Sequence, residues 1–187
     1  MNKILVVCGK GASGKDTLLK TLVNDGFVPA ISHTTRPMRK GETDGVEYHF
    51  IDFEEFVYRH TLREFVEMRE YNTAQGAWYY GVTRDELNHK LELGNVVMIL
   101  DKKGLQALLK TEYKDRVVSV YLDVDGDVRL QRYLNREDIN IDVLEECVRR
   151  YKADEYDFEG IKDVVDCVIT NPRNVLESAV IVHKLVD

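Results

Sequence analysis

The chain has 187 residues, of which 44% are hydrophobic and 32% are charged. This length suits one α/β domain with small insertions, and the composition excludes an intrinsically disordered chain. A net charge of -7 and a pI near 5.3 disfavour nucleic acid or an anionic membrane as the main partner. Any site for a phosphorylated ligand must therefore be a local basic cluster on an acidic chain.

The cysteines and the N-terminus indicate a cytoplasmic protein. Cys8, Cys147 and Cys167 are odd in number, far apart and in apolar context, which predicts buried thiols in a reducing compartment. The N-terminal run MNKILVV is too short for a signal peptide, and no segment approaches the roughly 18 apolar residues of a membrane span.

Strand and helix patterns alternate along the chain. The helix after the first apolar run ends near Gly26, and a later one is bounded by a Thr83–Glu86 capping box and by Gly94. Alternating strands and helices predict an α/β fold with a mostly parallel sheet flanked by helices. Four short β-branched segments are expected as its buried strands: residues 4–7, 96–100, 117–122 and 167–170.

Two segments interrupt this alternation. One is rich in Thr, Arg, Gly and Tyr, and the other is a charged amphipathic helical region. We predict one domain with a core of residues 1–31, 84–124 and 159–187, an insertion at 32–83 and a second at 125–158.

The clearest motif is CGKGASGKD, which follows the first predicted strand and has the spacing Gly-x4-Gly-Lys. Its glycines let successive backbone N–H groups point at phosphate oxygens, and the lysine reaches the outer phosphates. We therefore predict a nucleotide phosphate site with Lys15 as a catalytic cation. The predicted ATP-binding residues are Gly9, Lys10, Gly11, Ala12, Ser13, Gly14, Lys15, Asp16 and Thr17.

Asp16 stands where this motif normally has Ser or Thr. As a first-turn acid it favours the helix dipole by about 0.3–1 kcal/mol, whereas a phosphate about 4 Å away repels it by roughly 4 kcal/mol. Mg²⁺ reverses that sign because Asp is an ordinary ligand of hard cations. We expect Asp16 to bind the magnesium of Mg-ATP, directly or through a water, with a simple helix-start role as the alternative.

The segment SHTTRPMRKGETDGVEYHF places two arginines three residues apart and follows them with a tyrosine. A basic loop of this kind is more often a solvated surface, but two guanidiniums and a phenol also suit a dianionic phosphate. The segment reproduces Ser-x-Thr-Thr-Arg-x-x-Arg-x-Gly-Glu-x-x-Gly-x-x-Tyr, and in this it resembles guanylate kinases.

The resemblance implies a P-loop nucleoside monophosphate kinase fold that passes a phosphoryl group from Mg-ATP to GMP or dGMP. It makes residues 32–83 the acceptor-binding insertion and residues 125–158 the lid. A lone Glu on an amphipathic helix is usually solvated, so the base-reading role of Glu67, toward guanine N1 and N2, follows from the resemblance alone. The implied acceptor ligands are Ser32, Arg36, Arg39, Tyr48, Glu67 and Tyr80.

The resemblance also implies charged groups near the reacting phosphates. Asp101, at the end of VVMILD, is similar to a family acid that can assist the metal directly or through a water. Arg129, Arg132 and Arg136 share a helix face, which by itself is typical of a solvated surface. Opposite a phosphate loop, such arginines stabilise the migrating group. The implied catalytic residues are Lys15, Arg39, Asp101, Arg132, Arg136 and Arg150.

Three positions depart from the family pattern. Asp16 is the first, and nucleotide kinases as a class tolerate a residue without a hydroxyl there. Val82 replaces a Ser or Thr that bonds guanine, and Lys103 replaces a second acid that helps to read the base. Selectivity for guanine is therefore expected to be weaker.

Two other functions remain open at this stage. A ribose 1,5-bisphosphate phosphokinase resembles the chain at the departing positions but would not need the Ser32–Tyr48 motif or Glu67. A phosphopeptide-binding scaffold module would have lost the phosphate loop that is intact here. The sequence leaves the acceptor and the choice between monomer and homodimer undecided.

Overall fold

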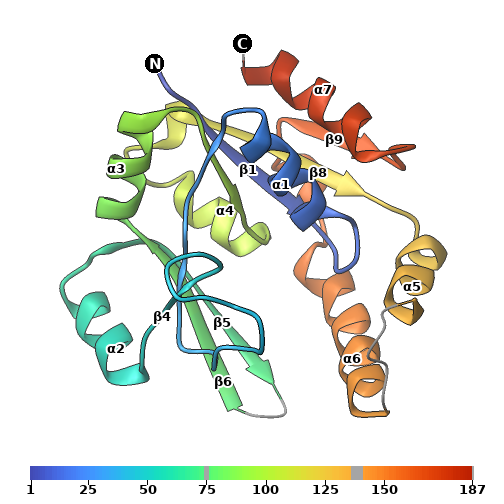
Figure 1. Cartoon of the computed structure of the whole chain (residues 1–187), viewed down its shortest axis with the longest axis horizontal. Helices are drawn as coiled ribbons and strands as arrows, with labels where there is room; N and C mark the ends of the chain where they lie inside the picture. The colour runs from blue at the N-terminus through green and yellow to red at the C-terminus, as the bar shows by residue number, and fades with distance from the viewer. Residues whose placement is uncertain (74–75, 136–140, 187) are drawn as a thin grey trace.

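A computed structural model describes residues 1–73, 76–135 and 141–186 (Figure 1). Its core is a five-stranded sheet in the order β2-β7-β1-β8-β9, and every pairing in it is parallel. This confirms the predicted mostly parallel sheet. The strands are β1 (Ile4–Gly9), β2 (Val28–Pro29), β7 (Val96–Ile99), β8 (Val117–Asp123) and β9 (Cys167–Thr170).

Helices cover both faces of this sheet because its strands are apolar on both sides. Leu5 and Val7 of β1 face α1 (Lys15–Asn24) and α7 (Val175–Val186), whereas Ile4 and Val6 face α3 (Arg84–Leu93) and α4 (Lys102–Leu108). Two short 3-10 turns lie just before strands of this sheet: Lys114–Arg116 precedes β8 and Ile161–Asp163 precedes β9. The predicted cap is present, since the Thr83 side chain accepts from the N–H of Glu86.

The segment from β3 to β6 forms a second sheet beside the core, with strand order β4-β3-β6-β5. Helix α2 (Phe53–Thr61) joins β4 to β5. Glu67 lies on β5, not on a helix, and it is buried. The strand period of two puts Glu67, Arg69 and Tyr71 on one face of β5. The strands are β3 (His33–Thr34), β4 (His49–Phe50), β5 (Phe65–Thr73) and β6 (Gly76–Thr83).

The charged region after β8 contains helices α5 (Gly126–Leu134) and α6 (Ile141–Asp157). The β5–β6 hairpin and α6 project from the same side of the core, and the loop after β1 lies beside the C-terminal end of α6 (Figure 1). In the described part of the chain, no helix has the length and apolar character needed to cross a membrane. Cys8 and Cys147 are buried free thiols, and Cys167 is a half-buried one.

Candidate active site

The loop between β1 and α1 has the geometry of a phosphate cradle. Gly14 adopts φ +99°, a left-handed conformation that favours glycine, and it turns the chain into the first turn of α1. The ammonium of Lys15 donates to the carbonyl of Lys10 at 3.1 Å. Burial lowers the pKa of Lys15, while Asp16 and then Asp154 act in the opposite direction. A phosphate entering the loop would provide an anionic partner for this half-buried ammonium.

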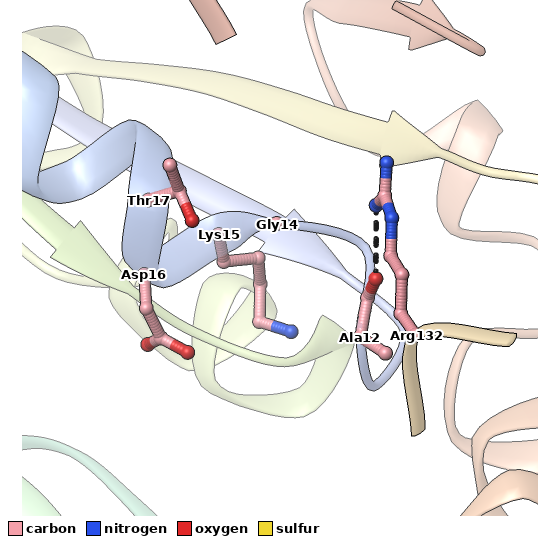
Figure 2. Close-up of a pocket in the computed structure, with 6 residues that line it drawn as sticks. All are labelled: Ala12, Gly14, Lys15, Asp16, Thr17 and Arg132. Carbon is pink, nitrogen blue, oxygen red and sulfur yellow. Dashed lines mark hydrogen bonds between the residues drawn. The ribbon is translucent and has the colours of Figure 1, made fainter. Parts of the chain in front are cut away.

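A pocket of about 220 Å³ opens on this loop and is lined by Ala12, Gly14, Lys15, Asp16, Thr17 and Arg132 (Figure 2). Arg132 comes from α5 and donates to the carbonyl of Ala12 at 3.0 Å. The side chains of Lys15 and Asp16 point in different directions from the start of α1, so the ammonium and the carboxylate lie at different parts of the pocket (Figure 2). The pocket therefore combines predicted residues of the loop with one predicted arginine of the lid.

Two acids of α6 contact the same loop. Asp154 Oδ2 accepts from the N–H of Gly11 at 2.6 Å, and Glu155 Oε1 lies 2.6 Å from Lys10 Nζ. Burial raises the pKa of Asp154, although the Gly11 N–H opposes this shift. A Cβ at position 11 would overlap the Tyr133 hydroxyl, at 1.7 Å, so glycine allows α5 to approach the loop. Sequence reasoning missed these acids because no local motif marks a contact across about 143 residues.

Arg129 is the central cation of this lid contact. Its side chain is 3% exposed, and its guanidinium lies 3.5 Å from Asp154, 3.4 Å from Glu155 and 4.7 Å from the ring centre of Tyr151. The helix face that carries Arg129 is therefore partly buried against α6.

The other lid arginines of the prediction have different placements. Arg136 and the side chain of Arg150 lie outside the described residues. The neighbouring Arg149 donates to the carbonyl of Asn72 at 3.3 Å, which connects α6 to the end of β5.

The acceptor insertion brings three predicted phosphate ligands together. Arg36 is buried and donates to both carboxylate oxygens of Glu42, at 2.7 and 3.0 Å. Its guanidinium lies 5.2 Å from the ring centre of Tyr48, and the rings of Tyr48 and Tyr80 are 5.6 Å apart. Arg39 is exposed, with its N–H bonded to Glu42 at 2.7 Å.

Ser32 is half-buried at the start of this insertion, where its carbonyl accepts from the N–H of His49 at 3.0 Å. This backbone bond joins the Ser32 segment to β4. The predicted base-side residue is therefore anchored to the same small sheet as the phosphate ligands.

Behind Tyr80 lies a buried polar network that the sequence reasoning did not identify. Arg69 Nε is 2.9 Å from Glu67 Oε2, and Arg69 Nη2 donates to Glu67 Oε1 at 3.3 Å. Tyr71 donates to Asp101 Oδ2, and Asp101 Oδ1 accepts from the N–H of Gly104 at 2.7 Å, capping α4. Both predicted acids therefore have partners within the chain. The sequence did carry a signal for this network, because Glu67, Arg69 and Tyr71 alternate with the period of two that is typical of a strand.

Burial and charge oppose each other in this network. Burial raises the pKa of Glu67, and the adjacent Arg69 opposes that shift. Burial lowers the pKa of Arg69, but Glu67 and then Tyr71 outweigh it, so that the pKa is raised overall. We infer an ionised pair, since each charge is the nearest compensation for the other.

Two of the three departing residues have opposite environments. Val82 is fully buried in the hydrophobic core that includes Leu87 and Leu91. The side chain of Lys103 is 77% exposed and lies 3.9 Å from Asp157. Val82 has no polar side-chain group, and the ammonium of Lys103 is directed to an acid of α6.

Cys8 lies at the end of β1, directly before the phosphate loop. Burial raises the pKa of Cys8 to about 12; Asp101 adds to the shift, whereas Lys15 and Arg69 oppose it. The charges of the phosphate loop, of the N-cap of α4 and of β5 therefore all act on this buried thiol.

Comparisons with known proteins agree with this geometry. The family model of guanylate kinase matches residues 1–184. Guanylate kinase from Helicobacter hepaticus is 32% identical over 76% of this chain and 70% of that protein. Guanylate kinase from Francisella tularensis subsp. holarctica is 30% identical over 87% of this chain and 89% of that protein.

A solved structure supports the same conclusion about the fold. The crystal structure of guanylate kinase from Anaplasma phagocytophilum matches with a TM-score of 0.74 and 25% identity. The match covers 99% of this chain and 84% of that one.

Proposed function

The chain belongs to the guanylate kinase family, whose members are ATP-dependent nucleoside monophosphate kinases, and we propose that its acceptor is GMP or dGMP. The observation that carries this proposal is that one chain contains both a phosphate-loop pocket, which Arg132 reaches, and the cluster of Arg36, Tyr48 and Tyr80. These supply a donor-phosphate site and an acceptor-phosphate site, the two sites that direct transfer between two bound substrates requires.

Each part of the site has a role in transfer from ATP to the acceptor phosphate. The loop N–H groups and Lys15 hold the donor phosphates, and Arg36, Tyr48 and Tyr80 hold the acceptor phosphate. Arg132 reaches the loop from the lid and stabilises charge on the migrating group. Arg39, exposed near Glu42, is free to turn toward the same phosphate when the acceptor enters.

The residues fit a magnesium ion that enters with ATP. Among the described residues, no group of three or more His, Cys, Asp or Glu could hold a metal by itself. Asp16 lines the pocket, and a single carboxylate with substrate phosphates and waters is a normal magnesium environment. Bound magnesium would neutralise charge on the donor phosphates. Asp101 remains a candidate second ligand, although both of its oxygens have partners in the chain.

A sugar bisphosphate is the second candidate acceptor, and one observation favours it. Arg69 occupies the carboxylate of Glu67, so the pocket contains a second buried guanidinium that could meet a second phosphate. The Ser32–Tyr48 segment and the buried Glu67 favour the nucleotide, because a sugar bisphosphate would need neither.

Acceptor choice is tested by following ADP formation from Mg-ATP with GMP, dGMP, AMP, UMP and ribose 1,5-bisphosphate. We expect kcat/KM to be highest for GMP and dGMP. Turnover of the sugar bisphosphate alone would replace the leading proposal with the second one. Absence of turnover with every acceptor would instead favour a binding-only role.

A further inference from the structure

The ion pair Glu67–Arg69 contains one acceptor atom and one donor atom that make no hydrogen bond. Arg69 Nε and Glu67 Oε2 are 2.9 Å apart, but neither atom has a hydrogen-bond partner among the described residues. The hydrogen bond of the pair runs instead between Nη2 and Oε1. Buried polar atoms without partners are rare in folded proteins, and they mark places where a ligand can complete the bonding.

The pair is held firmly by its surroundings. The Glu67 side chain is 0% exposed and that of Arg69 is 9% exposed. A Cβ at position 104 would lie 3.1 Å from both Glu67 Oε2 and Arg69 Cδ, so the glycine of α4 packs directly on the pair. On its other side Arg69 lies 5.9 Å from the ring centre of Tyr80. The donor, Arg69 Nε, and the acceptor, Glu67 Oε2, are therefore held in a fixed arrangement for a ligand base to contact.

Guanine has the complementary edge. Its N1–H donor is adjacent to the O6 acceptor, whereas adenine has an acceptor at N1 and a donor amine at C6. If the phosphate cradle fixes the register of the nucleotide, guanine gives two bonds and adenine gives two unfavourable contacts. Val82 and Lys103 cannot supply the O6 donor, because one is in the core and the other is exposed.

From this we propose that Arg69 is a specificity-determining residue that donates to guanine O6, next to Glu67, which accepts from N1–H. This inference rests on the proposed function, because it assumes that a guanine nucleotide enters the pocket. Arg69 would thereby replace the base contact that Val82 lacks.

The test compares GMP with its 6-thio analogue, which keeps N1–H but replaces O6 with the weak acceptor sulfur. We expect the wild-type enzyme to prefer GMP by about 5- to 100-fold in kcat/KM. Arg69→Met should lower kcat/KM for GMP by a similar factor and bring the ratio of the two substrates close to 1. Inosine monophosphate, which keeps O6 but lacks the 2-amino group, should remain as sensitive to Arg69→Met as GMP.

Glu70→Met is the matched control, since Glu70 is the next residue of β5 and is exposed on the opposite face. It should leave the ratio of GMP to 6-thio-GMP unchanged. Arg69→Met leaves the buried Glu67 without a partner and could prevent folding. In that case the double variant Glu67→Gln/Arg69→Met removes both charges, and its ratio of kcat/KM for GMP to that for 6-thio-GMP is measured instead. Thermal melting establishes which variants are folded.

The two possible failures are distinguishable. If the wild-type enzyme does not phosphorylate GMP, the proposed function is wrong and this inference is wrong with it. If the wild-type enzyme uses GMP but a folded variant without Arg69 retains the wild-type preference over 6-thio-GMP, only the role of Arg69 is overturned.

Discussion

The carboxylate of Asp154 accepts a 2.6 Å hydrogen bond from the backbone N–H of Gly11, in the loop that should bind phosphate. In this arrangement a lid acid satisfies a donor of the loop, and Glu155 beside it pairs with Lys10. Carboxylate and phosphate oxygens compete for the same kind of donor. The lid acids must therefore move when a nucleotide takes up the full loop.

Asp154→Asn should tighten ATP binding, because it removes a negative charge that competes with the phosphates. We expect the Kd of ATP to fall about 5- to 10-fold, since charge-assisted hydrogen bonds contribute roughly 1.5–3 kcal/mol and water replaces part of this. Isothermal titration calorimetry measures the change. Asp157→Asn changes an acid near the end of the same helix and is the control; it should leave the Kd of ATP unchanged. If Asp154→Asn instead binds ATP more weakly, the carboxylate of Asp154 stabilises the ATP complex and does not compete with the phosphates.

Asp16→Ala should raise the magnesium concentration that gives half-maximal activity. The carboxylate lines the pocket, and without it the ion depends on phosphates and waters alone. We expect an increase of about 3- to 10-fold, corresponding to roughly 0.7–1.4 kcal/mol of metal binding. Asp25→Ala changes an acid at the other end of α1 and serves as the comparison. An unchanged magnesium requirement would return Asp16 to a helix-start role.

Arg132→Met should lower kcat more than it raises KM for either substrate. Arg132 reaches the loop from α5, and its removal takes positive charge away from the migrating phosphoryl group. Stabilisers of this kind typically contribute about 10²–10³ in kcat. Steady-state kinetics with saturating GMP and ATP measures the loss. Gln131→Met replaces an exposed neighbour and should retain full activity; an equal effect of both variants would point to a disturbed helix.

Stability should fall in acid in a window set partly by His33. Burial lowers the pKa of His33 from 6.5 to about 4, and His49, whose ring centre lies 4.8 Å away, contributes in the same direction. Between these two pH values His33 binds more protons in the unfolded chain than in the folded one, so its contribution lowers the free energy of unfolding as the pH falls from about 6.5 to about 4. Urea midpoints measured at pH 7, 5.5 and 4 follow the decrease.

His33→Phe keeps a ring beside Phe65 but cannot take up a proton. Its urea midpoint should fall less between pH 7 and pH 4 than that of the wild-type protein, because the proton uptake of His33 on unfolding no longer contributes. Equal slopes for the two proteins would contradict the assignment to His33.

The sequence predicted those features that short local patterns encode. Glycine spacing after an apolar run identified the loop from Gly9 to Lys15, and the Thr83–Glu86 cap was present where predicted. The place of Glu67 on a strand was missed, since a single acid carries no period and the alternation with Arg69 and Tyr71 was overlooked. The contacts of Asp154 with the loop depend on the tertiary fold alone, because they join segments at opposite ends of the chain.

Two arginines of the acceptor insertion are already paired with anions, Arg36 with Glu42 and Arg69 with Glu67. An incoming nucleotide that binds these two guanidiniums therefore replaces carboxylates that already balance their charge. On a chain with a net charge of -7, such balanced guanidiniums exert little long-range attraction on a free dianion. The association rate of the acceptor should accordingly change little with ionic strength, and selectivity should come from contacts made after the acceptor has arrived.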